Sequence, residues 1–247
     1  MPVSPWLNCR IPQPDAACRL VCFPCAGGGT ASYFAWPEAF SGEVDVHVVQ
    51  MPGRERRRGE PLLTSFDDVL KNLVPAIEAI ADRPLAFFGH SMGALLAFEV
   101  ARVLRRRATG DVAHLFLAAR DAPGQTNPPL HQLPDEQLVA LLDARYGGIP
   151  DAIRNDPDLL QFFIPIIRAD LAVLASHRWQ EDDPLSCRLT VMGGRQDLST
   201  SEPSLANWQR HTIGGFQLKM FDGDHFFPNS QRDEVTRDIC SILAASL

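Results

Sequence analysis

Ser91 is the residue whose setting most strongly indicates chemistry. It is the third residue of Gly89-His90-Ser91-Met92-Gly93, between a short apolar run and an Ala/Leu-rich run of helical rhythm. A G-x-S-x-G sequence between a strand and a helix forms a sharp turn that exposes the serine hydroxyl above a sheet. Both glycines are expected there because the strand and helix backbones approach closely. The sequence therefore predicts that Ser91 is a nucleophile; the alternative is a glycine-rich turn with an incidental serine.

A serine nucleophile needs a general base, and the base needs a third group that orients it. Asp197 and His225 each follow a later predicted strand, and the order Ser, Asp, His is a known order for such triads. Among the seven histidines, only His225 follows the last predicted strand. Asp121 also follows a predicted strand and is the rival for the acid. Asp222 and Asp224 are too close to His225 in sequence to face its ring easily.

The negative charge that develops on the attacked carbonyl oxygen needs preorganised backbone N–H donors. One donor is expected at Met92, the residue after the nucleophile. The other is expected at Ala26, in the glycine-rich loop Cys25-Ala26-Gly27-Gly28-Gly29 that follows the first long strand. The glycines would let this loop approach a substrate, and they would equally suit a simple flexible turn.

Composition limits the classes of function. The chain has 247 residues and a formal net charge of −7, which argues against a general affinity for nucleic acid. No apolar run approaches the roughly 20 residues that span a bilayer, and the N-terminus lacks the apolar core of a signal peptide. We expect a cytoplasmic protein with reduced cysteines. No P-loop, dinucleotide fingerprint or metal-ligand spacing is found in the sequence, so we expect no cofactor and no metal.

Strand and helix patterns alternate along most of the chain, after an irregular lead-in over 1–17. Strands are expected at 19–24, 44–50, 85–88, 114–118, 189–192 and 216–221, and helices at 32–40, 64–81, 91–107 and 233–247. This alternation predicts an α/β fold with a mostly parallel central sheet and helices on both faces. The ligand crevice should lie at the carboxyl ends of the strands, where the glycine-rich loop and Ser91 are placed.

The alternation stops between about residues 128 and 184. Only helical patterns are found there, over 138–146 and 157–179, with a break at Gly147-Gly148. A helical insertion above the carboxyl ends is a candidate lid. The alternative is a helical layer that only packs against the sheet. We treat 1–247 as a single domain that carries this insertion.

Six separated segments resemble those of a known family. They are Phe23-Pro24-Cys25-Ala26-Gly27-Gly28, Gln50-Met51-Pro52-Gly53-Arg54-Glu55-Arg56, Phe88-Gly89-His90-Ser91-Met92-Gly93-Ala94, Phe98-Glu99-Val100-Ala101-Arg102, Arg168-Ala169-Asp170 and Asp222-Gly223-Asp224-His225-Phe226-Phe227. Together they resemble the type II thioesterases of polyketide and nonribosomal peptide synthesis, over nearly the whole chain from Leu20 to the C-terminal helix.

The resemblance implies an α/β-hydrolase with a helical lid that hydrolyses acyl groups from the phosphopantetheine arm of carrier proteins. It implies a triad of Ser91, Asp197 and His225, oxyanion donors at Ala26 and Met92, and neither a metal nor a bound cofactor. A general esterase or a chain-releasing or acyl-transferring enzyme would keep this fold. A non-catalytic module that binds carrier proteins is the third hypothesis, against which the complete Ser/Asp/His set argues.

Two features bear on substrate and partner. The family usually has histidine where this chain has Cys25, so Cys25 is a candidate residue of the substrate pocket, affecting substrate preference or loop packing. Carrier proteins tend to be acidic, so docking would need a local basic patch. The arginines at 54 and 56–58 are one candidate and those at 105–107 another, although both runs also read as plain solvated charges.

Overall fold

A seven-stranded sheet forms the centre of the computed structural model over the residues that it describes, 4–40, 42–110, 112–124, 127–147, 149 and 155–245. The strand order is β1-β3-β2-β4-β5-β6-β7, and every neighbouring pair is parallel except the antiparallel pair β1–β3. The strands are β1 (Leu7–Asn8), β2 (Cys18–Phe23), β3 (Val44–Val49), β4 (Leu85–His90), β5 (Val112–Ala118), β6 (Arg188–Gly194) and β7 (Phe216–Phe221). The predicted mostly parallel α/β fold is confirmed.

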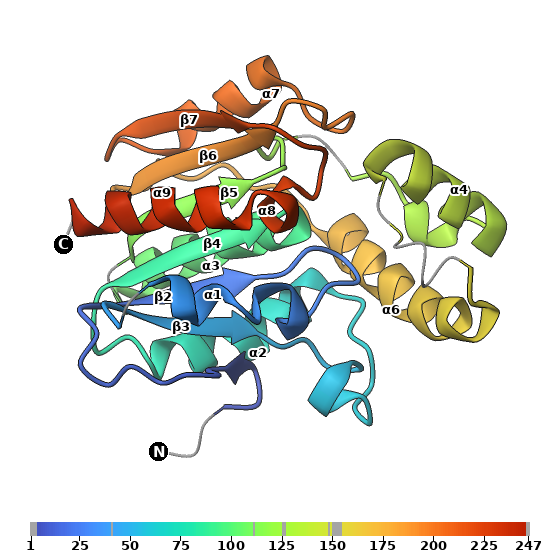
Figure 1. The fold of residues 1–247 in the computed structure, drawn as a ribbon, viewed down its shortest axis with the longest axis horizontal. Helices are drawn as coiled ribbons and strands as arrows, with labels where there is room; N and C mark the ends of the chain where they lie inside the picture. Colours follow the sequence, from blue (N-terminus) through green and yellow to red (C-terminus); the bar gives the residue numbers. More distant parts are fainter. Residues whose placement is uncertain are drawn as a thin grey trace.

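Helices cover both faces of this sheet (Figure 1). The α-helices are α1 (Trp36–Ala39), α2 (Phe66–Glu78), α3 (Met92–Arg107), α4 (Asp135–Tyr146), α6 (Pro157–Ser176), α7 (Glu202–Ala206), α8 (Phe227–Ser230) and α9 (Arg232–Ala244). Short 3-10 helices lie at η1 (Thr30–Tyr33), η2 (Glu55–Arg57), η3 (Leu130–Gln132) and η4 (Asn207–His211). In the figure α1, α8 and α9 lie in front of the sheet, and α2 and α3 lie behind it.

Strand β4 shows why the central strands are apolar throughout. Successive side chains point to opposite faces of a strand. Leu85 and Phe87 pack into the core with α2 and α3, whereas Ala86 and Phe88 pack into the core with α1 and α9. A strand buried on both faces must therefore be a continuous apolar run, not an alternating one. This is the pattern that precedes Ser91.

The insertion lies beyond the carboxyl ends of the strands, where α4 and α6 stand beside the sheet (Figure 1). Asp156 caps the start of helix α6: its side chain accepts hydrogen bonds from the N–H groups of Asp158 and Leu159 at 3.0 and 3.1 Å. Helix α4 ends at Gly147, which adopts the left-handed conformation that terminates many helices. The second glycine of the predicted break, Gly148, lies outside the described residues.

Helix α6 corrects one expectation. With 20 residues and a mean hydropathy of 1.7, it is long and apolar enough to cross a membrane by length and composition. The sequence scan missed it because Asp158, Arg168 and Asp170 interrupt the apolar run. Of the apolar window of this helix 39% is buried, and Asp170 is fully buried and paired with Arg54.

The N-terminal segment was predicted to be irregular, and that prediction is wrong at one point. Leu7 and Asn8 pair with Val49 and Val48 as the antiparallel strand β1. A strand of this length carries too few residues for a periodic pattern. The predicted helix over 32–40 is divided into η1 and α1.

Candidate active site

The predicted turn at Ser91 forms between β4 and α3. Ser91 has φ 56° and ψ −110°, a backbone conformation that is strained for a residue with a side chain. Its N–H donates to the Ala118 carbonyl at 2.8 Å, which fixes the turn to the neighbouring strand. A Cβ at Gly93 would lie 1.9 Å from the carbonyl oxygen of Phe23. The second glycine is therefore required by the contact between α3 and the end of β2.

Asp197 and His225 are brought together by the loops after β6 and β7. His225 Nδ1 lies 3.0 Å from Asp197 Oδ2, and both residues are buried. The Asp197 carboxylate also accepts hydrogen bonds from the N–H and hydroxyl of Ser199, at 2.8 and 2.6 Å, and from the Thr200 hydroxyl at 3.1 Å. Burial raises the pKa of Asp197, but the hydrogen bonds from His225 and Ser199 outweigh it and the net pKa is lowered. Asp197 is therefore an ionised acceptor for the imidazole.

Ser199 is a residue that sequence reasoning missed. Its hydroxyl donates to Asp197 Oδ1 and lies 3.0 Å from His225 Nδ1, so a proton on Nδ1 has two acceptors. This arrangement favours the tautomer in which Nδ1 carries the proton and Nε2 accepts. Its only sequence signal was a hydroxyl residue two positions after the candidate acid.

Ser91 and His225 line the same pocket, of about 120 Å³. Within the described residues the His225 ring is hydrogen-bonded at Nδ1 only, and no hydrogen bond joins it to Ser91. The Tyr146 ring from α4 lies 4.7 Å from the imidazole, centroid to centroid. The His225 carbonyl lies 2.8 Å from His90 Nε2. Burial, with the adjacent His225, lowers the pKa of His90 to about 3, so His90 acts as a neutral donor.

The loop after β2 carries Ala26, the candidate oxyanion donor. The N–H groups of Ala26 and Met92 have no hydrogen-bond acceptor in the part of the chain that the structure describes, which leaves both available. The next N–H in the loop, that of Gly27, donates to Asp170 Oδ2 at 2.7 Å. The loop is therefore tied to helix α6 of the insertion.

A buried ion pair holds this loop in place. Arg54 donates to both oxygens of Asp170, at 2.7 and 2.6 Å, and to the Gly28 carbonyl at 3.0 Å. Arg54 is 5 % exposed and Asp170 is 0 % exposed. The expectation of a solvated arginine is therefore wrong for Arg54. The available signal was Asp170 of Arg168-Ala169-Asp170, a charged residue within an otherwise largely apolar helix.

Arg57 corrects the same expectation. Its guanidinium donates to the Gln50 carbonyl at 2.7 Å and to Glu60, and it stacks 4.4 Å above the Trp6 ring. The exposed arginines of this run are Arg56 and Arg58. The first candidate docking patch is thus reduced to two side chains.

The second candidate patch is partly neutralised. Arg105 and Arg106 pair with Asp182, at 2.6 and 3.3 Å, and Arg107 pairs with Glu78 at 3.3 Å. Arg106 and Arg107 keep about half of their side chains exposed, 47 % and 50 %.

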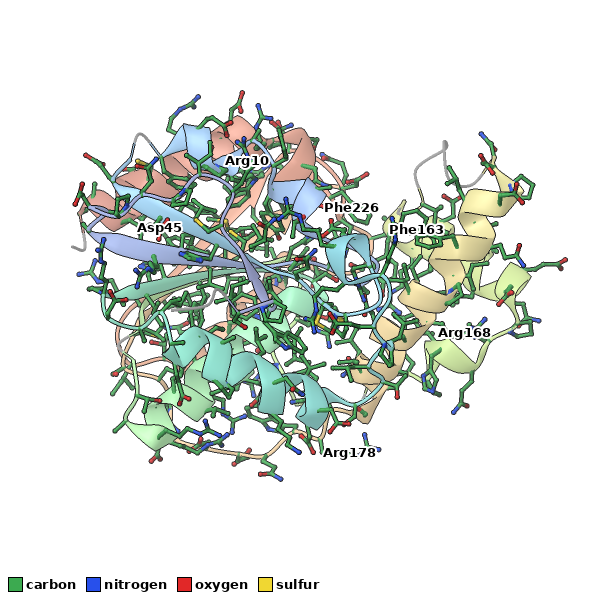
Figure 2. The ribbon with its side chains drawn as sticks, turned by 90° about the horizontal axis from the view of Figure 1, so that it is seen from below. Arg10, Asp45, Phe163, Arg168, Arg178 and Phe226 are labelled. Carbon is green, nitrogen blue, oxygen red and sulfur yellow. The ribbon has the colours of Figure 1, made fainter. Side chains whose placement is uncertain are left out.

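A second, larger pocket of about 700 Å³ lies between the glycine-rich loop and α6. Its walls include the apolar side chains of Ile149, Leu160, Phe162, Phe163, Ile166, Ile167 and Phe226. Figure 2 shows Phe163 of the insertion and Phe226 of the loop after β7 next to one another at this boundary. Cys25 lines the pocket as a half-buried thiol, and burial, with the nearby Asp170 charge, raises its pKa to about 12.

The rival acid Asp121 lines the Ser91 pocket but does not reach His225. Its Oδ1 accepts from the Ser204 hydroxyl at 2.5 Å. Among the described residues, the carboxylate bonded to His225 is that of Asp197.

Cys9, Asp45 and His47 form the one group in the described residues whose ligand atoms lie close enough together to hold a metal ion. The Asp45 carboxylate already accepts hydrogen bonds from the Gln13 N–H at 3.0 Å and from Arg19 at 3.3 Å. An arginine at this distance opposes a second cation. We interpret the group as a structural hydrogen-bond cluster on the lead-in and β3.

Comparisons with known proteins agree with the fold. The model of the thioesterase domain family matches residues 18–243. The gramicidin S biosynthesis protein GrsT of Aneurinibacillus migulanus is 35% identical over 243 residues, which cover 98% of this chain and 94% of that protein.

Solved structures give the same result. The RedJ thioesterase of the prodiginine pathway in Streptomyces coelicolor has a TM-score of 0.87 and 33% identity, covering 95% of this chain and 89% of that one. The type II thioesterase BorB of the borrelidin biosynthetic cluster has a TM-score of 0.84 and 33% identity, covering 96% of this chain and 95% of that one. These likenesses confirm the expected α/β-hydrolase fold.

Proposed function

This chain belongs to the thioesterase domain family, among the type II thioesterases of polyketide and nonribosomal peptide pathways, and we propose that it hydrolyses acyl thioesters on carrier proteins. The acyl group would be released from the phosphopantetheine arm, which editing of a stalled or wrongly primed synthase requires. The observation that carries the proposal is the hydrogen-bonded pair of Asp197 and His225 on the pocket that Ser91 lines.

The proposed reaction has two halves. Ser91 Oγ attacks the thioester carbonyl carbon while His225 Nε2 takes the hydroxyl proton. The C–S bond breaks, the thiol of the arm leaves with the proton from His225, and an acyl-enzyme remains. Water then attacks the acyl-enzyme with His225 again as the base, which releases the free acid and restores Ser91. Asp197 stabilises the imidazolium at each stage without taking the proton.

The oxyanion of each tetrahedral intermediate would be bound by the N–H groups of Ala26 and Met92. Removing one donor of this kind typically costs about 10²–10³ in kcat. The hydrogen bond from Gly27 to Asp170 supports the proposal, because it fixes the peptide next to the Ala26 donor. No step of this mechanism uses a metal or a cofactor, and the phosphopantetheine belongs to the substrate.

The substrate and its carrier would occupy different parts of the site. We assign the apolar pocket beside Cys25 to the acyl chain, because its lining is mostly hydrocarbon. Helices α4 and α6 would act as the lid over it. Arg56 and Arg58 are the exposed cations nearest the glycine-rich loop in sequence and would meet the acidic carrier in the cytoplasm.

The test compares wild-type protein with Ser91→Ala on acetyl- and propionyl-carrier protein, with acyl-enzyme measured by mass spectrometry. We expect turnover and an acyl adduct on Ser91 in the wild type, and neither in the variant. Faster hydrolysis of small free esters than of carrier thioesters would favour a general esterase. Tight carrier binding without any acyl-enzyme would favour a binding module.

A further inference from the structure

Glu55 binds the residues that directly follow the three glycines of the glycine-rich loop. Its Oε2 accepts a hydrogen bond from the Thr30 hydroxyl at 2.9 Å, and its Oε1 accepts one from the Ala31 N–H at 3.2 Å. Arg54, the preceding residue, donates to the Gly28 carbonyl at 3.0 Å. Two side chains that are adjacent in sequence therefore hold the loop at two separate points.

The backbone of Glu55 is strained. Its φ of 48° lies in the left-handed region, which residues with a side chain rarely adopt. Two backbone hydrogen bonds enforce the turn around it, from the Gly53 N–H to the Arg57 carbonyl at 2.9 Å and from the Arg57 N–H to the Arg54 carbonyl at 2.8 Å. Glycine would adopt this conformation without strain, so the position carries a glutamate against the preference of its backbone. Such an enforced outlier points to a function of the side chain.

Gly29 leaves the space that the Glu55 carboxylate occupies. A Cβ built on Gly29 would lie 2.5 Å from Glu55 Oε1 and 2.8 Å from the carboxyl carbon, and the three atoms nearest to it all belong to this carboxyl group. The φ of Gly29 is −158°, an extended conformation that any residue adopts. The lack of a side chain at Gly29 is therefore explained by the contact with Glu55, not by the backbone of the loop.

We propose that Glu55 is a positioning residue for the oxyanion donor at Ala26. Three successive glycines give a loop more conformational freedom than other residues would, and an oxyanion donor lowers the barrier only where it is preorganised. The contacts of Arg54 and Glu55 remove this freedom on the C-terminal side of Ala26. Ala26, Gly29 and Glu55 all line the apolar pocket, so the contact borders the site itself. The proposal rests on the proposed thioesterase reaction and adds a residue that supports its transition state.

The experiment measures kcat and KM with acetyl-N-acetylcysteamine, a thioester that needs no carrier docking. Glu55→Ala should lower kcat about 10-fold and change KM less than about twofold, because the Ala26 N–H is still present but less well ordered. This loss is smaller than the roughly 10²–10³ that follows deletion of a donor. Hydrogen exchange over residues 25–31 should become faster in the same variant. The control is Glu38→Ala, which removes an exposed carboxylate paired with Arg10 and should leave kcat within about twofold.

Two further substitutions at Glu55 separate position from stability and from charge. Glu55→Gly removes the carboxylate and the strain together, so it should unfold at a higher temperature than Glu55→Ala and show the same low kcat. Glu55→Gln should keep kcat within about threefold of the wild type, because its amide can still accept from Ala31 and bond to Thr30. Wild-type kcat in Glu55→Gly would assign the side chain no part in the reaction. A Gln variant as slow as Glu55→Ala would assign the effect to charge, and either result would overturn the proposal.

Gly29→Ala tests the contact from the side of the loop. The added methyl group must displace the Glu55 carboxylate, so kcat should fall about 5- to 10-fold in the wild-type background and less than about twofold further in Glu55→Ala. Losses that multiply in the double variant would mean that the two positions act independently, which also overturns the proposal. Absence of Ser91-dependent hydrolysis in the wild type would instead refute the underlying reaction.

Discussion

The carboxyl edge of the sheet and the helical insertion above it are held by different interactions. At the edge, Ser91 and Gly93 are fixed by a backbone hydrogen bond and by backbone contact with β2. The insertion shares the hydrophobic core of that edge through buried residues such as Leu138, Val173 and Leu174, and adds the buried ion pair Arg54–Asp170. The apolar pocket lies between the insertion and the glycine-rich loop. The turn that carries Ser91 is thus fixed by backbone packing, whereas the glycine-rich loop beside the apolar pocket depends on a buried carboxylate of the insertion.

The largest effect is expected at the edge, in Asp197→Asn. Replacing the acceptor of His225 Nδ1 by an amide favours the wrong tautomer, which in other triads lowers kcat by about 10⁴. The matched change in the insertion is Asp135→Asn, which removes the partner of Arg168 on the surface of α4. It should leave kcat within about twofold, as surface pairs contribute little. Steady-state kinetics on an acyl-carrier substrate measures kcat for both variants. Comparable losses of kcat in the two variants would contradict this prediction.

Asp170→Asn removes the buried ion pair between the insertion and the sheet edge. It leaves the buried Arg54 guanidinium without its carboxylate, which typically costs about 3–5 kcal/mol in the free energy of unfolding. The control is Asp238→Asn, which breaks the partly exposed pair with Lys219 and should cost less than about 1 kcal/mol. Urea unfolding followed by fluorescence measures both values. Equal small losses would mean that the pair does not hold the loop.

Gly93→Ala tests the packing at the edge. The added Cβ would meet the Phe23 carbonyl at 1.9 Å, so strand or helix must move, with an expected loss of about 3 kcal/mol. Gly59→Ala is the control, because no atom lies within 4 Å of a Cβ built there. Thermal unfolding of the two variants gives the comparison. If the Gly93→Ala protein were as stable as the Gly59→Ala protein, the close contact at Gly93 would not limit the side chain at this position.

The smallest effect per residue is the contribution of each buried histidine on the sheet side to the pH dependence of stability. Burial lowers the pKa of His90 to about 3, and burial also lowers those of His114 and His211 to about 4. These histidines are protonated only in the unfolded chain between about pH 6.5 and 4, so stability is full above pH 6.5 and falls as pH decreases. Each contributes up to about 1.4 kcal/mol per pH unit.

Urea midpoints at pH 7 and pH 5 measure this slope. His114→Asn should flatten it, because one of the three titrating groups is removed. If the wild type were equally stable at both pH values, the histidines would not be neutral in the folded protein.

The difference between local and long-range contacts explains which features could be predicted from the sequence. The strands, the turn at Ser91 and the placement of Asp197 and His225 follow from local patterns, because residues next to one another in sequence determine them. Arg54 and Asp170 are 116 positions apart, and no local pattern distinguishes a buried arginine from its solvated neighbours. The role of the Ser199 hydroxyl likewise depends on a tertiary contact, because it lies beside His225, 26 positions away. The α/β-hydrolase fold was therefore predictable, whereas the contacts that tie the insertion to the site were not.

The Asp170 carboxylate has a practical consequence for protein engineering. It accepts hydrogen bonds from Arg54 and from the Gly27 N–H, so one side chain of the insertion supports two segments of the sheet domain. A chimera that takes its insertion from another protein must import an acid at this position, or lose the support of the glycine-rich loop. The boundary for recombination in this fold is therefore set by that contact, not by the ends of the inserted helices.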